Sequence, residues 1–155
     1  MHSIGLLRLM CVLPYEIHTV DFVAAELINE GQKQAFNKLV NKGKIIVDSF
    51  TAEEVLEIVA EHSSVSGNLS IPDCSVCYYA KKHGVPMLTG DRRLRHHAEQ
   101  LSTEVHGKLF PFDEMVANSV IASAEAADKL AALMALNSRL PQAAIRERID
   151  KWRSL

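Results

Sequence analysis

Apolar residues along the chain follow two patterns, one typical of helices and one typical of buried strands. Short apolar runs without alternation, of which Lys44–Val47 is the clearest, are typical of strands covered on both faces. Between these runs, apolar residues recur at helical spacing. The pattern predicts strands over residues 16–20, 44–47, 85–89 and 103–106, and helices over 4–12, 22–40, 51–62, 72–83, 91–101, 113–136 and 141–152.

Strands and helices alternate along the chain, which indicates an α/β fold with a mainly parallel sheet. We expect three layers, α/β/α, around a central sheet of about four strands, followed by two C-terminal helices. The chain opens with a helix, whereas such folds usually open with a strand at the centre of the sheet. Either four strands suffice, or a first strand has been lost.

Polar residues mark several of the predicted helix ends. Thr51 with Glu54 three residues later has the spacing of a capping box, and Ser70 is placed to cap the next helix. Asp21 is expected to cap the helix that follows it, and Gly84 is expected to end the 72–83 helix.

Length and composition describe an ordinary globular protein. The 155 residues fit one domain, so we expect a single domain over 1–155 with a helical C-terminal extension over about 113–155. With 48% hydrophobic and 23% charged residues, the chain has no disordered character. No apolar run approaches the ~20 residues that span a bilayer. The first residues lack the basic start and apolar core of a signal peptide, so we expect a cytoplasmic protein with no membrane partner.

Charge and cysteine content exclude two further classes. Lys plus Arg number 17 and Asp plus Glu number 19, so the net charge is -2 and bulk attraction to nucleic acid is absent. Nucleic-acid binding would need a local basic patch. The three cysteines, Cys11, Cys74 and Cys77, are too few for a disulfide scaffold, and we expect the last two to pack in the core.

Three acidic residues occupy positions at which an apolar residue or a ligand is expected. Glu26 lies three residues after Val23, on the apolar stripe of the predicted 22–40 helix. Asp73 lies four residues before Cys77, on another face that is predicted to be buried. Asp91 follows the predicted 85–89 strand, directly outside the carboxyl end where ligands bind in open α/β sheets.

Each of these acids alone has a structural explanation. Glu26 could pair with a lysine, Asp73 could complement a helix dipole, and Asp91 could cap the helix after it. Three acids at one edge of a sheet are better explained by a hard divalent cation with oxygen ligands, Mg²⁺ or Mn²⁺, because no histidine or thiolate accompanies them at ligand spacing.

Basic residues follow the last of the three acids. Arg92, Arg93 and Arg95, together with His96 and His97, come directly after Asp91. They are candidates for binding the phosphates of RNA. The alternative is that they form a solvated helix face.

Several segments of the chain resemble PIN domains. The most specific is Leu88-Thr89-Gly90-Asp91, and the others cover residues 19–27, 71–81, 105–109 and 140–149. The resemblance extends over about residues 5–152. It implies a metal-dependent ribonuclease, often the toxin of a prokaryotic type II toxin–antitoxin pair, whose cut leaves a 5′-phosphate and a 3′-hydroxyl.

The resemblance also assigns roles to residues. It implies that Glu26, Asp73 and Asp91 are catalytic acids that hold Mg²⁺ or Mn²⁺, and that Thr89 supports the metal cluster. The first metal-binding aspartate of the family has no counterpart, because no aspartate precedes Asp21. Loss of one of four ligating acids should weaken metal binding and lower the activity.

Two functions therefore stay open. The first is a divalent-metal endoribonuclease with RNA as its substrate, a cognate antitoxin as its partner, and a homodimeric state suggested by family habit and by the apolar segment over residues 6–13. The second is a catalytically impaired PIN-like module that binds RNA or protein. A receiver-like domain is set aside, because the chain lacks the paired acids that such domains place after their first strand.

Overall fold

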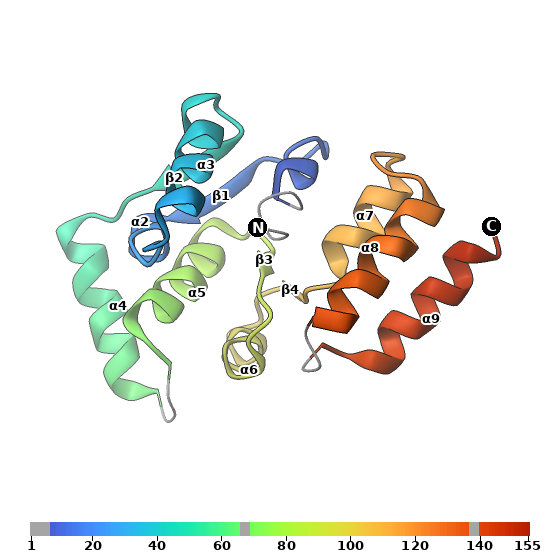
Figure 1. The fold of residues 1–155 in the computed structure, drawn as a ribbon. Coiled ribbons are helices and arrows are strands. Elements are labelled where there is room, and N and C mark those ends of the chain that lie inside the picture. Colours follow the sequence, from blue (N-terminus) through green and yellow to red (C-terminus); the bar gives the residue numbers. More distant parts are fainter. Residues whose placement is uncertain (1–6, 66–68, 137–139) are drawn as a thin grey trace. The chain divides into compact units, whose positions relative to one another are not determined.

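The computed structural model describes residues 7–65, 69–136 and 140–155 (Figure 1). The chain forms two compact units, Met1–Lys108 and Leu109–Leu155. Of the first predicted helix, residues 7–10 are helical and residues 4–6 lie outside the described ranges.

The first unit alternates strands and helices, which confirms the predicted α/β class with a PIN-like arrangement. The four predicted strands are present, and none is longer than predicted. The elements are β1 (Ile17–Val20), α2 (Asp21–Ala24), α3 (Glu30–Asn41), β2 (Ile45–Asp48), α4 (Ala52–Ser64), α5 (Ile71–His83), β3 (Met87–Leu88), α6 (Arg92–Gln100) and β4 (Val105–His106).

All four strands pair in parallel, in two separate pairs. β1 lies beside β2 with Ile17 opposite Ile45, and β3 lies beside β4 with Met87 opposite Val105. Among the described residues no ladder joins the two pairs. Helix α5 contacts both β1 and β3, so it is the element that the two pairs share.

The core of this unit gathers around α5. Cys74 and Cys77 are fully buried there and pack with Ile58 of α4, Met87 of β3 and Leu94 of α6. Burial raises the pKa of Cys77 to about 12, with a smaller contribution from nearby acids. The thiol therefore stays protonated at neutral pH, and the prediction that these cysteines are core residues is confirmed.

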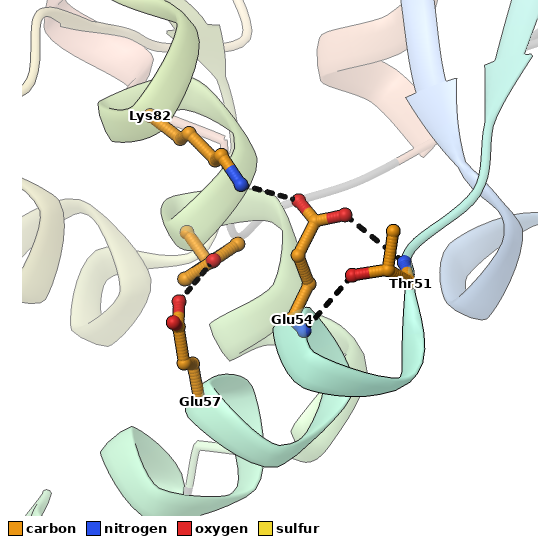
Figure 2. A network of polar contacts seen from close by, with 5 residues as sticks. Thr51, Glu54, Glu57 and Lys82 are labelled. Atoms are coloured by element: carbon orange, nitrogen blue, oxygen red, sulfur yellow. Dashed lines mark hydrogen bonds and ion pairs between the residues drawn. The ribbon is translucent and has the colours of Figure 1, made fainter.

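The predicted capping box of Thr51 and Glu54 is confirmed. The Thr51 hydroxyl accepts the N–H of Glu54, and the Glu54 carboxylate accepts the N–H of Thr51 (Figure 2). Lys82 of α5 donates to the same carboxylate at 2.9 Å, which ties α5 to α4. The hydrogen bond from Thr51 and then the one from Lys82 lower the pKa of Glu54 to about 2. Gly84 ends α5 in the left-handed conformation, with φ of 62°.

The prediction of one helix over residues 22–40 is wrong. Helix α2 ends at Ala24, and α3 begins only after Asn29, whose side chain accepts the N–H of Gln32. A side chain that satisfies the backbone in this way competes with helix continuation. Asp21 is not the cap of α2 either, because Val20 holds that position and Asp21 is the first helical residue.

The second unit consists of helices. They are α7 (Phe110–Ala117), α8 (Ser123–Leu136) and α9 (Gln142–Arg153), and their buried side chains include Met115, Leu130 and Trp152. The 141–152 helix is confirmed as α9. One continuous helix over 113–136 is wrong, because Ser119 takes a left-handed conformation with φ of 57° that ends α7.

A bidentate ion pair connects two helices of this unit. The Arg148 guanidinium on α9 contacts the two oxygens of Asp113 on α7 at 2.7 and 2.8 Å. The Asp113 carboxylate raises the pKa of Arg148 further above its already high value. Across both units, none of the described helices has the length and apolar character needed to cross a membrane.

Candidate functional site

The carboxyl ends of β3 and β4 lie side by side, because the two strands are parallel. The N–H of Met87 donates to the carbonyl of Glu104 at 2.9 Å, and the N–H of Thr89 donates to the carbonyl of His106 at 3.0 Å. These bonds hold the loop after β3, residues 89–91, next to the loop after β4, residues 107–108. We call this place the β3–β4 edge.

Asp91 is fixed at the β3–β4 edge by local hydrogen bonds. Its Oδ1 accepts the N–H groups of Arg93 and Leu94 at 2.8 and 3.1 Å, which makes it the N-cap of α6. Its own N–H donates to the Thr89 hydroxyl at 3.1 Å. Thr89 therefore orients the backbone of Asp91, and Asp91 starts the helix that carries the arginines.

Asp73 also has a capping role. Its carboxylate accepts the N–H of Ser70 at 3.1 Å, while its N–H donates to the Ser70 hydroxyl at 3.2 Å. The side chain is half-buried at the start of α5. The helix-end roles considered for Asp73 and Asp91 are thus both observed.

Glu26 lies in the turn after α2 and is exposed, so the prediction that it lies on the apolar stripe of a helix is wrong. Among the residues that the structure describes, no three His, Cys, Asp or Glu side chains lie close enough to share a metal ion. Glu26, Asp73 and Asp91 are therefore not brought together. In this conformation they do not fit a divalent ion as a preformed set of ligands.

Arginines occupy the N-terminal turns of α6, where the helix dipole does not favour positive charge. Arg92 and Arg93 are exposed in its first turn, which contains no acidic residue, and Arg95 is half-buried one turn later. The N-terminus of a helix carries partial positive charge, so cations there gain nothing from the helix dipole. The ion pairs found within the described ranges do not include these arginines.

His97 does not belong to this basic surface. Its side chain is buried against α4, and its Nε2 lies 3.0 Å from the Glu61 carboxylate. The pair ties α6 to α4. His96, by contrast, is exposed on α6 and lies within hydrogen-bond distance of Gln100.

A second polar cluster, not foreseen from the sequence, joins β1, β2 and α5. His18 Nδ1 lies 2.7 Å from the Asp48 carboxylate and 3.3 Å from the Tyr79 hydroxyl. The Tyr79 ring packs against His83 with 4.2 Å between ring centroids. Burial raises the pKa of Tyr79, and the hydrogen bond with Asp48 raises it further. No spacing signal links residues this far apart in the chain.

Comparison with known proteins gives one family. The family model DUF3368, described as PIN domain, matches residues 1–154. A search of curated proteins finds no match to the chain. PIN domains are generally nucleases, so the match assigns a nuclease-type fold. Because the match extends over almost the whole sequence and the parallel strands and helices agree with it, the chain belongs to the PIN-domain family.

Proposed function

We propose that this protein is a ribonuclease that hydrolyses RNA phosphodiesters with the help of Mg²⁺ or Mn²⁺, and that the RNA binds at the β3–β4 edge. The observation that carries the proposal is the group of arginines that directly follows Asp91 in the first turns of α6 and has no ion-pair partner among the described residues. In a chain of net charge -2, RNA binding depends on such a local patch. The PIN-domain family supplies the nuclease class.

Residues of the chain divide into two roles under this proposal. Arg92, Arg93 and Arg95 bind phosphates, and Thr89 holds the backbone of Asp91 beside them. Glu26, Asp73 and Asp91 are the acids that would supply oxygen ligands, and a bound divalent ion would neutralise charge that develops on the phosphate. Since these acids do not gather in the described conformation, the geometry itself supports only the RNA-binding part of the reaction.

The test is cleavage of a labelled single-stranded RNA with Mg²⁺, Mn²⁺ or a chelator. We expect cleavage by the wild-type protein only with metal, and a decrease of at least about 100-fold in Asp91→Asn. Asparagine still caps a helix, so the variant stays folded. Equal cleavage by the two proteins would refute the assignment of Asp91.

The second candidate is an RNA-binding module without nuclease activity. The observation that favours it is that the three acids lie at separate local positions, two of them already used as helix caps. This function predicts that the wild-type protein binds RNA and leaves it intact with every metal. The cleavage assay therefore separates the two candidates.

The proposal extends to a toxin role, with a cognate antitoxin as partner and a homodimer as the working state. The support is the family resemblance and the apolar character of the early segment, in which Val12 is 67% exposed. Light scattering should give twice the 17.2 kDa of one chain. A mass equal to a single chain would contradict the dimer.

A further inference from the structure

Two glycines at the β3–β4 edge are each covered by a long cationic side chain. A Cβ on Gly90 would overlap Cε of Lys108 and lie 2.8 Å from its Cγ and Cδ. A Cβ on Gly107 would overlap Nη2 of Arg95 and lie 3.3 Å from its Cζ. Lys108 follows β4 and lies across the loop after β3, whereas Arg95 follows β3 and lies across the loop after β4. Each cationic side chain thus lies over the loop that follows the other strand.

Backbone conformation does not explain these glycines. Among the described residues, the glycines with positive φ are Gly43 and Gly84, which end helices. Gly90 and Gly107 have backbones that any residue can adopt. What the two positions require is space, and the space is filled by Lys108 and Arg95.

Among the described residues, neither cation forms an ion pair that would stabilise the fold. The ion pairs of the described part of the chain leave out both Lys108 and Arg95. The adjacent acid, Asp91, uses its Oδ1 to cap α6. Two like charges held on neighbouring loops without a counterion are a suitable receptor for an anion.

We propose that Lys108 and Arg95 form a phosphate clamp for single-stranded RNA, in which Gly90 and Gly107 set the positions of the two cations. Arginine offers a planar fork for a phosphate, and lysine offers a point charge. The clamp rests on the proposed RNA function of the same edge and adds Lys108 and the two glycines to its residues. The missing side chains of the glycines allow the cations to lie flat on the loops.

The first test measures binding of a labelled single-stranded RNA in the presence of a chelator, so that no cleavage occurs. Lys108→Ala and Arg95→Ala should each weaken binding about 5- to 10-fold at low salt. Each should reduce the slope of log K against log salt by about 0.7. The matched control is Lys33→Ala on α3, a helix that contacts β2, and it should bind as the wild type does.

The second test uses the glycines, because their replacement changes no charge. The atoms nearest to an alanine Cβ at position 90 are Cγ, Cδ and Cε of Lys108, an exposed and flexible side chain that can rotate away, so Gly90→Ala should keep the wild-type thermal stability. It should lose as much RNA affinity as Lys108→Ala does. The double variant should lose no more than either single variant, because both act through the same contact. Gly107→Ala and Arg95→Ala should behave in the same way.

Three results would overturn the clamp: no RNA binding by the wild type, wild-type binding by Lys108→Ala, or additive losses in the double variant. Failure of the clamp is distinguishable from failure of the ribonuclease proposal. If RNA is cleaved but Lys108→Ala binds normally, only the clamp is wrong. If Lys108 is needed for binding but RNA is never cleaved, only the nuclease activity is wrong.

Discussion

A carboxylate at the start of a helix can serve stability and chemistry at once, and Asp91 is the residue for which we propose both roles. Its Oδ1 caps α6, which presents three arginines next to it. A substitution of Asp91 can therefore change both the stability of the fold and the proposed chemistry. The choice of replacement decides which of these two effects is measured.

We predict that Asp91→Ala lowers the free energy of unfolding by about 1 kcal/mol, because the cap is lost. Asp91→Asn should lower it by much less, because an asparagine oxygen accepts the same N–H groups. Urea unfolding of both variants, followed by circular dichroism, measures the difference. If Asp91→Asn destabilises as strongly as Asp91→Ala, the carboxylate charge is itself structural and the cleavage test loses its meaning.

Glu54 gives a prediction about pH. Its pKa is about 2 in the folded protein, against an ordinary value of 4.5. Because the folded pKa is the lower one, the interactions of Glu54 stabilise the fold fully above about pH 4.5 and are lost as the pH falls toward 2. Glu54→Gln keeps the capping-box geometry but cannot ionise.

Urea midpoints at pH 7 and pH 3 should therefore show wild type more stable than Glu54→Gln at pH 7, with a smaller difference at pH 3. Glu53→Gln, in the same helical turn, is the control and should show no such change. A difference between wild type and Glu54→Gln that does not vary with pH would contradict the account of this network.

At the scale of elements, the sequence predicts those features that depend on interactions between residues close together in the chain. Strands, capping boxes and the left-handed Gly84 follow from neighbours in the chain. The break after α2 is equally local: residues 29–34 carry no apolar side chain, and Asn29 caps the next helix, in which apolar spacing resumes at Ala35 and Phe36. The split of the strands into two pairs depends on tertiary placement, so no sequence pattern reports it.

The break between α7 and α8 carries a prediction of its own. Ser119 is exposed and holds a left-handed backbone that glycine adopts without cost. Ser119→Gly should raise the stability of the second unit by about 1 kcal/mol. Urea unfolding followed by the fluorescence of Trp152, the single tryptophan, measures this unit. Ser119→Ala is the control and should not stabilise; a gain equal to that of glycine would exclude strain at this residue.

The candidate site was only partly predictable, because some of its residues are neighbours in the sequence and others are brought near only by tertiary packing. The Leu88-Thr89-Gly90-Asp91 turn and the arginines after it are adjacent in sequence, so their proximity could be foreseen. Whether Glu26 and Asp73 come near Asp91 depends on packing, and in the described residues the three do not gather. Lys108 over Gly90 joins two loops that only strand pairing brings together.

At the scale of the whole molecule, the net charge is negative although the β3–β4 edge is rich in cationic side chains. The chain carries a net charge of -2, yet the β3–β4 edge has Arg92, Arg93, Arg95 and Lys108 without ion-pair partners in the described ranges. Because bulk attraction to RNA is absent, we expect binding to depend on this edge and to be sensitive to salt.

The most direct measurement is an NMR titration of the isotope-labelled protein with a short single-stranded RNA in the presence of a chelator. The account predicts that the amide signals of residues 89–95 and 106–108 shift together as RNA is added, and that those of α3 stay in place. Shifts centred on another part of the chain, with the signals of residues 89–95 unchanged, would contradict it.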